Sequence, residues 1–231
     1  MPNFDIVRKS KPKKSFRVAS IIGKFDLQGE EVTERFVGNI EFPKKWQIGL
    51  IVGSSGTGKT TIAKELFSNA YITHFNYSAE CILDDMPENK SVDEITRTFN
   101  SVGFSSPPSW LKPYSALSNG QKMRVDLAKA LLSENQLTVF DEFTSVVDRN
   151  VAQIGSHAIQ KAIRKSDKQF IAVTCHFDVE DWLLPDWVFN TDSMTFQSFE
   201  GQKKKIDQKL NLKYSKQQIN QYGKCLLNTI I

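Results

Sequence analysis

A glycine-rich loop followed by a lysine and a threonine is the first place where this sequence could do chemistry. Gly53-Ser-Ser-Gly-Thr-Gly-Lys59-Thr60 follows the short apolar run 47–52 and precedes a segment with helical spacing, residues 60–69. Glycines let backbone N–H groups curl around phosphate oxygens, and the start of a helix adds a positive partial charge. We therefore expect a phosphate-binding loop, in which Lys59 reaches the β- and γ-phosphates and the Thr60 hydroxyl ligates Mg²⁺. The predicted binding residues are Gly53, Ser54, Ser55, Gly56, Thr57, Gly58, Lys59, Thr60 and Thr61.

Polar side chains also follow two later apolar runs. Residues 137–140 predict a buried strand, and Asp141 and Glu142 come directly after it. Residues 170–174 predict another buried strand, and His176 follows it. An acidic turn and an ordinary loop histidine are the plain alternatives when each motif is taken alone.

A fourth motif connects these elements to a known family. Leu117-Ser-Asn-Gly-Gln121 resembles the signature motif of ABC (ATP-binding cassette) ATPases, Leu-Ser-Gly-Gly-Gln, with Asn119 in its third position. Ser118 offers a hydroxyl donor, Gly120 permits close approach of a γ-phosphate, and the helix that they open points its positive end there. A plain capped helix is the alternative for these five residues in isolation. The resemblance implies that Ser118, Gly120 and Gln121 contact an ATP molecule held by a second subunit.

The same resemblance assigns roles to the residues after the strands. Asp141 would hold Mg²⁺ through water, and Glu142 would act as the general base that polarises the attacking water. His176 resembles the switch histidine that contacts the γ-phosphate, so the predicted catalytic residues are Lys59, Glu142 and His176. Phe143 stands where the family commonly has proline.

Two elements of the family pattern are less evident. No glutamine marks the Q-loop, and Asp84 or Asp85 occupies the corresponding region; we assign Asp84 as a further metal ligand, with an exposed acidic turn as the alternative. For the aromatic side chain that stacks on the base, Phe25 is the candidate, and Phe16 and Phe36 compete with it.

Alternating strands and helices must position these motifs. Helices are expected near residues 60–69, 92–102, 118–132 and 150–165, between the buried strands, and this alternation favours a parallel sheet. The expected fold class is α/β, a P-loop NTPase of ABC-ATPase type. Its mostly parallel core sheet would carry helices on both faces, an N-terminal antiparallel β subdomain and a reduced helical subdomain at about 80–132.

Charge divides the chain into three parts. Residues 1–15 are expected to form a basic, exposed arm, residues 16–200 the ATPase domain with antiparallel strands over 16–42, and residues 201–231 a lysine-rich tail. Residues 1–17 sum to +5 and residues 201–231 to +6, which leaves −7 for the rest of a chain of net charge +4. Basic ends could attract nucleic acid, or they could simply keep the protein soluble.

Composition indicates a cytoplasmic protein. Hydrophobic residues make up 40% of the chain, and no apolar run approaches the roughly 20 residues that cross a bilayer. The N-terminus lacks the apolar core of a signal peptide. Three widely separated cysteines indicate a reducing compartment rather than a disulfide framework.

The resemblance implies a head-to-tail homodimer that binds and hydrolyses Mg-ATP at two composite sites. The segment between Lys59 and Leu117 is shorter than we would expect of a transporter subunit, which leaves little room for a subdomain that grips a membrane partner. The strings around Trp110, Val139 and Pro185 resemble soluble, stand-alone ABC ATPases of phages and bacteria. We expect a switch or motor acting on nucleic acid or protein. The alternatives are the ATP-binding subunit of a transporter and an ATP-gated binding module with negligible turnover.

Overall fold

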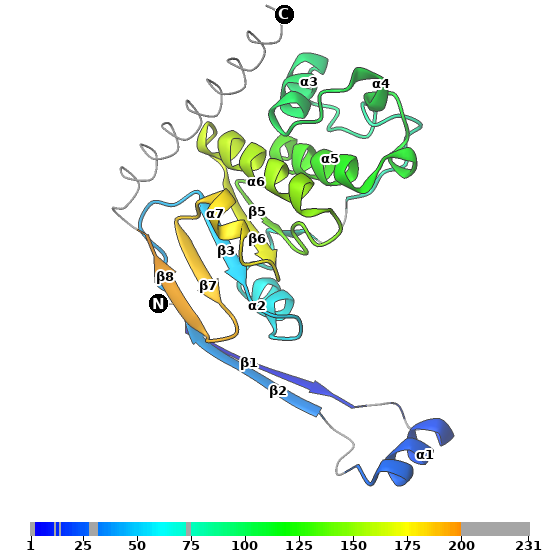
Figure 1. Cartoon of the computed structure of the whole chain (residues 1–231), viewed down its shortest axis with the longest axis vertical. Helices are drawn as coiled ribbons and strands as arrows, with labels where there is room; N and C mark the ends of the chain where they lie inside the picture. Colours follow the sequence, from blue (N-terminus) through cyan, green and yellow to red (C-terminus); the bar gives the residue numbers. More distant parts are fainter. Residues whose placement is uncertain (1–2, 12, 14, 28–31, 73–74, 200–231) are drawn as a thin grey trace, which may run out of the picture.

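A six-stranded sheet forms the centre of the protein (Figure 1). The structure is a computed structural model that describes residues 3–11, 13, 15–27, 32–72 and 75–199, so the lysine-rich segment 201–231 lies outside the described residues. The strand order is β4-β5-β6-β3-β7-β8, and every neighbouring pair is parallel except β7 and β8. The strands are β3 (Ile48–Val52), β4 (Tyr71–Ile72), β5 (Leu137–Phe140), β6 (Gln169–Thr174), β7 (Trp187–Asn190) and β8 (Thr195–Ser198). The predicted mostly parallel sheet is therefore confirmed.

Helices cover both faces of this sheet, as the sequence predicts. Successive side chains of a strand point to opposite faces. Leu50 of β3 belongs to one buried cluster, which it shares with α5 (Asn119–Leu132), α6 (Arg149–Arg164) and α7 (Val179–Leu183). Its neighbour Ile51 belongs to a second cluster, which it shares with α2 (Lys59–Leu66). The continuous apolar character of β3 follows from burial on both sides.

The helical subdomain, residues 80–132, contains α3 (Val92–Ser101), α4 (Pro107–Trp110), the 3-10 turn η1 (Tyr114–Ala116) and α5. A stacked aromatic pair secures it to the segment that precedes it. The rings of Tyr77 and Tyr114 stack with their centroids 3.9 Å apart, and both hydroxyls donate to Asp126 of α5, at 2.7 and 2.9 Å. Among the described residues, no helix is long and apolar enough to cross a membrane.

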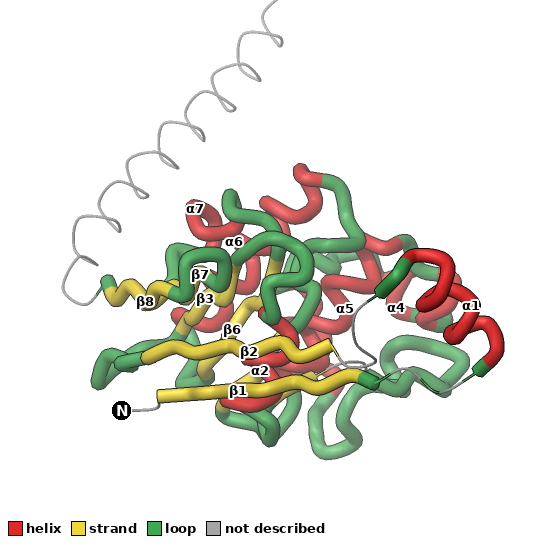
Figure 2. The backbone as a smooth tube through the Cα atoms, turned by 90° about the horizontal axis from the view of Figure 1, so that it is seen from below, coloured by secondary structure: helices red, strands yellow, loops and turns green. Residues whose placement is uncertain are grey.

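The N-terminal region differs from our expectation in two ways. The expected exposed arm is largely a strand, β1 (Asn3–Ser10), which pairs in antiparallel fashion with β2 (Val32–Asn39). Phe4 and Ile6 alternate along β1 and are buried, so their period of two outweighs the neighbouring lysines. The pair β1–β2, called the ribbon below, lies against the sheet face that carries α2 (Figure 2).

The segment between the two ribbon strands is a helix, α1 (Phe16–Phe25), where we predicted a strand. Ser15 caps its start, because its hydroxyl accepts a hydrogen bond from the amide of Val18 at 3.2 Å. The apolar residues of α1 recur at helical rather than strand spacing, and within residues 16–42 the predicted antiparallel strand is present only as β2.

Close packing of β3 on β7 depends on a glycine. A Cβ atom at Gly49 would lie 2.1 Å from the ring of Trp187, which is completely buried. The ring also packs edge-on against Phe42 and Trp46, with centroids 5.2 and 5.4 Å away, so it cannot move aside freely. Only glycine therefore fits at position 49.

We expect Gly49→Ala to lower the free energy of unfolding by about 1–3 kcal/mol, because the added methyl group overpacks this part of the core. Gly23→Ala on α1 is the matched control, since a Cβ there meets nothing within 4 Å. Urea denaturation followed by tryptophan fluorescence measures both. Equal unfolding midpoints for Gly49→Ala and the parent protein would show that the β3–β7 contact is looser than the structure indicates.

Candidate active site

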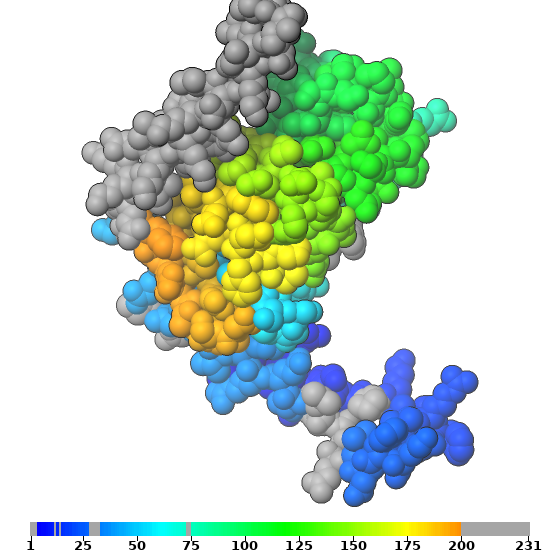
Figure 3. Space-filling model, in the orientation of Figure 1, coloured from blue at the N-terminus to red at the C-terminus, as the bar shows by residue number. Residues whose placement is uncertain are grey.

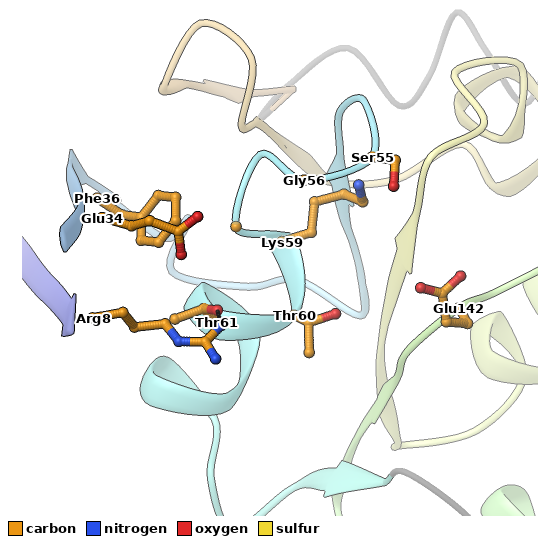
Figure 4. Close-up of a pocket in the computed structure, with 10 residues that line it drawn as sticks. Arg8, Glu34, Phe36, Ser55, Gly56, Lys59, Thr60, Thr61 and Glu142 are labelled. Carbon is orange, nitrogen blue, oxygen red and sulfur yellow. Dashed lines mark hydrogen bonds between the residues drawn. The ribbon is translucent and has the colours of Figure 1, made fainter. Parts of the chain in front are cut away.

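The glycine-rich loop lies at the carboxyl end of β3 and leads directly into α2, with a pocket of about 230 Å³ beside it. Figure 4 shows the pocket between the ribbon and the end of β5. The structure brings seven predicted residues to its lining: Ser55, Gly56, Gly58, Lys59, Thr60, Thr61 and Glu142. Arg8, Glu34 and Phe36 of the ribbon complete it.

Two left-handed glycines and one aromatic contact give the loop its curvature. Gly56 and Gly58 have φ of 85° and 86°, a region that side chains with a Cβ rarely adopt. A Cβ at Gly58 would also lie 2.3 Å from the ring of Phe36. Glycine is therefore required at position 58 by its own dihedral angle and by its neighbour.

The segment after β7 supports the other side of the loop. Asp192 accepts hydrogen bonds from the Ser54 amide at 2.8 Å and from the Ser54 hydroxyl at 3.1 Å. The hydroxyls of Thr57 and Thr191 lie 2.6 Å apart. Ser54 and Thr57 thus serve the shape of the loop, and Lys59 donates to the Ser54 carbonyl at 2.6 Å. Thr191 and Asp192 are not among the predicted site residues; they follow β7, which pairs in parallel with β3 and ends at the same edge of the sheet.

Asp141 lies beside the loop and is held by several donors. It accepts from the Thr60 hydroxyl at 2.8 Å, from the Glu142 amide at 2.9 Å, and from the Tyr71 hydroxyl. Burial, and then the Asp141 carboxylate, raise the pKa of Tyr71, so its phenol remains a donor at neutral pH. Thr60 and Asp141 place a hydroxyl and a carboxylate side by side, and oxygen donors of this kind fit the predicted Mg²⁺.

Glu142 occupies a strained turn that points its side chain at the pocket. Its φ is 53° and that of Thr144 is 70°, and left-handed conformations in such residues cost about 1–3 kcal/mol each. Phe143 between them stabilises the turn: its ring is fully buried, and its amide donates to the Val173 carbonyl at 2.9 Å. Proline, common here in the family, could not make this hydrogen bond. Ser145 donates to the Glu142 carboxylate at 2.6 Å.

His176 follows β6 and lies beside the same turn. Its Nδ1 atom is 3.0 Å from the hydroxyl of Thr144, and its amide donates to the Thr174 hydroxyl at 3.2 Å. The parallel pairing of β5 and β6 places the carboxyl ends of both strands at one edge of the sheet. The structure therefore brings His176 next to the turn that carries Glu142, although the two residues lie far apart along the chain.

The signature residues lie elsewhere in the chain. Ser118 caps α5 in a reciprocal capping box with Gln121, at 3.3 and 3.0 Å, and Gln121 also donates to the Ser109 hydroxyl at 3.1 Å. A Cβ at Gly120 would lie 2.9 Å from Val151 of α6. Ser118, Gly120 and Gln121 are absent from the lining of the pocket.

Phe25 and Asp84 are also separate from the pocket, contrary to our expectation. Phe25 lies on α1, beyond the end of the ribbon, with 62% of its surface exposed (Figure 1). Asp84 accepts a hydrogen bond from the Cys81 thiol at 3.1 Å in the helical subdomain. Phe36, the competitor of Phe25, is the aromatic residue that lines the pocket.

Arg8 and Glu34 are site residues that the sequence analysis missed. They are paired across the ribbon, and they continue the inward-facing rows of Ile6 and Phe36 past the core to the pocket. Arg8 donates to the Thr61 hydroxyl at 2.9 Å, which positions its guanidinium at the start of α2. The strand alternation that buries Ile6 could have revealed both residues.

Known proteins with similar sequences define the class. Residues 49–179, more than half of the 231 residues, match the family described as "ATPase family associated with various cellular activities (AAA)". A probable ATP-binding cassette sub-family F member 3 homolog from Encephalitozoon cuniculi is 30% identical over 105 residues, 43% of this chain but only 19% of that protein. The energy-coupling factor transporter ATP-binding protein EcfA1 from Mycoplasmopsis synoviae is 26% identical over 182 residues, 63% of this chain and 68% of that protein.

Solved structures share the fold. The dimeric structure of a bacterial ABC transporter cassette matches with a TM-score of 0.57 at 15% identity, over 76% of this chain and 95% of that chain. A bacterial Atm1-family ABC exporter with ATP bound matches with a TM-score of 0.51 at 18% identity, over 62% of this chain and 32% of that chain. Fold and site define a P-loop ATPase. The chain belongs to the AAA-described family of ATPases. Its fold is that of ABC cassettes, and ATP-binding cassette proteins are among its relatives in sequence.

We expect Phe36→Ala to weaken ATP binding about tenfold, because the pocket loses its aromatic wall and a stacking contact with a base contributes about 1–3 kcal/mol. Phe25→Ala is the matched control and should bind ATP like the parent protein. Isothermal titration calorimetry measures both, and Phe36→Tyr should restore affinity if the ring is what matters. A loss of affinity in Phe25→Ala with none in Phe36→Ala would reverse the assignment.

Proposed function

We propose that the protein is a switch that hydrolyses Mg-ATP at composite sites of a head-to-tail homodimer and acts on a nucleic-acid or protein partner. One observation carries this proposal. The phosphate pocket and the signature residues Ser118, Gly120 and Gln121 both belong to the chain, but they do not meet within it. A second copy would bring its own signature to the open side of the pocket.

The signature is built to meet an anion. Ser118 is the N-cap of the 14-residue helix α5, and the N-terminal end of a helix carries a positive partial charge. Gly120 keeps the first turn narrow, because any side chain there would meet Val151. Two solved structures of the same fold are described as dimeric ABC cassettes, one of them bound to ADP and Pi, which supports a dimer as the working form.

The described residues support a direct displacement at the γ-phosphate. Glu142 would take a proton as water attacks phosphorus, and the bond from the γ-phosphorus to the bridging oxygen would break to give ADP and phosphate. Lys59 and the loop amides would stabilise the charge on the phosphates, and His176 would contact the γ-phosphate. Thr60 and Asp141 would hold Mg²⁺, which would supply positive charge at the phosphates when bound.

The size of the helical subdomain indicates what kind of partner the ATP cycle acts on. Before Leu117, the helical subdomain contains α3, a helix of ten residues, α4, a single turn of four residues, and the 3-10 turn η1 of three residues. This leaves a small surface for gripping a membrane partner, so we favour a soluble load. The likeness to EcfA1, which covers 63% of the chain, favours the second candidate, a transporter subunit. Co-purification with a membrane protein would support that alternative, whereas salt-sensitive stimulation by DNA or RNA would support the first.

Glu142→Gln should reduce ATP hydrolysis by at least 100-fold while ATP binding persists, because the amide cannot accept the proton from water. A dimer should then accumulate in the presence of ATP, and sedimentation velocity detects it. Normal turnover in this variant would rule out Glu142 as the base. Tight ATP binding with negligible turnover by the parent protein would instead support the ATP-gated binding module.

Complementation between two inactive variants tests the composite site. Ser118→Arg blocks the signature and Lys59→Ala removes the phosphate contact, so each homodimer should be inactive. A mixed dimer contains one intact pairing of pocket and signature, and up to a quarter of the parent activity should return when the two are mixed in equal amounts. Formation of mixed dimers without any recovery of activity would contradict a site shared between subunits.

A further inference from the structure

Helix α1 carries an apolar stripe that the described part of the chain does not cover. Val18, Ile21, Ile22 and Phe25 recur at i, i+3, i+4 and i+7, which places them along one side of the helix. No residue of α1 is buried, and Ile21 and Phe25 expose 50% and 62% of their surfaces. A helix of ten residues is marginal in water without a packing partner. We therefore expect a partner outside the described residues of the chain to cover the stripe.

The position of α1 indicates where that partner lies. Figures 1 and 3 show α1 standing apart from the body of the molecule, at the far end of the ribbon. Arg8 and Glu34, near this end of β1 and β2, line the nucleotide pocket. The ribbon thus passes the pocket and continues beyond it. Any partner that closes over the pocket would be next to α1.

Charge indicates which partner surface fits. Residues 9–27, which contain α1, carry six lysines and arginines against Asp26, a net charge of +5. In the helical subdomain, residues 80–95 carry six acidic residues against Lys90, a net charge of −5. This surface combines the opposite charge with an apolar contact, because Val92 exposes 65% of its surface there. The exposed acidic residues of the segment are Glu80, Asp84, Glu88, Asp93 and Glu94.

We propose that α1 docks on the helical subdomain of the second copy when ATP closes the dimer. The inference rests on the proposed composite site, because a second copy must bring its signature, and with it residues 80–132, over the pocket. The proposed docking adds a second contact between the subunits, in which α1 of each subunit binds the helical subdomain of the other. The stripe of four side chains is too small to hold a dimer alone, so the contact should strengthen the ATP-bound dimer rather than replace ATP.

Other partners fit the same observations less well. Pairing of α1 with the α1 of the second copy would bring two segments of charge +5 together. Nucleic acid would satisfy the lysines and leave the apolar stripe exposed to water. An anionic membrane could bind a short basic amphipathic helix, but residues 18–200 sum to −7 and would be repelled from that surface.

The test places Ile21→Glu and Phe25→Glu together in the Glu142→Gln background and measures dimerisation with ATP by sedimentation velocity. The dimer dissociation constant should rise at least tenfold, while ATP affinity measured by calorimetry at protein concentrations too low for dimers to form should not change. Folding should also be unaffected, since neither side chain is buried. Phe16→Glu is the matched control: Phe16 lies on the opposite side of α1, about 180° from Phe25, and is 88% exposed.

Zero-length cross-linking locates the contact. A carbodiimide joins lysines to carboxylates that touch, and a mixture of ¹⁵N-labelled and unlabelled protein separates links between copies from links within one. With ATP we expect links between Lys24 or its neighbouring lysines and residues 80–95 of the partner, and these links should disappear in the Ile21→Glu/Phe25→Glu variant.

Four outcomes would overturn the inference. Dimerisation equal to the Glu142→Gln parent would show that α1 makes no contact, and equal weakening by Phe16→Glu would show that the stripe has no special role. Loss of binding to phosphatidylglycerol vesicles or to DNA, with unchanged dimerisation, would assign α1 to that other partner. If the Glu142→Gln parent forms no ATP-dependent dimer, the proposed function fails together with the inference. If the parent dimerises and the α1 variant dimerises equally well, only the inference fails.

Discussion

The phosphate loop keeps its shape because other parts of the chain confine it from two sides, and most features of the site depend on that confinement. Gly58 lies against the ring of Phe36 on the ribbon side, closer than any side chain would allow. Asp192 and Thr191 hold Ser54 and Thr57 on the β7 side. A loop rich in glycine loses more conformational entropy on folding than other segments, so these contacts must offset that cost. They also determine where the ribbon runs, and therefore where Arg8, Glu34 and α1 lie.

Strain at the turn that carries Glu142 is stabilised in the same way, by packing at a distance from the pocket. Glu142 and Thr144 adopt left-handed conformations on either side of Phe143. The ring of Phe143 packs edge-on against Phe140 and Phe170, with centroids 6.0 and 5.7 Å away. A buried aromatic anchor and one backbone hydrogen bond thus take the place of the proline that is common in the family. The direction of the Glu142 side chain is a consequence of how the core packs.

The pocket and the signature residues, which we propose as the two halves of one nucleotide site, lie apart within the chain. The capping box of Ser118 and Gln121 makes the signature a rigid helix start, and the pocket is equally preformed around α2. Because these two preformed surfaces cannot meet within one chain, they are well suited to reversible association of two copies. A ligand bound between the copies would control that association. The ribbon and α1 extend this arrangement, because they project from the edge of one of those surfaces.

Local patterns in the sequence were sufficient to predict those helices, strands and turns that depend only on residues close together in the chain. The apolar runs of β3, β5 and β6, the spacing of α2, α3, α5 and α6, and the glycines of the phosphate loop predict those structures directly, because burial on two faces, helical periodicity and left-handed turns each leave a mark within a short stretch of sequence. The same holds for the order of Asp141, Glu142 and His176 after parallel strands. Contacts between distant segments leave no such mark. Only the tertiary structure decided that Phe36 and Arg8, rather than Phe25, line the pocket, and that Asp192 secures Ser54. It also revealed α1, a helix in a segment for which the sequence predicts antiparallel strands.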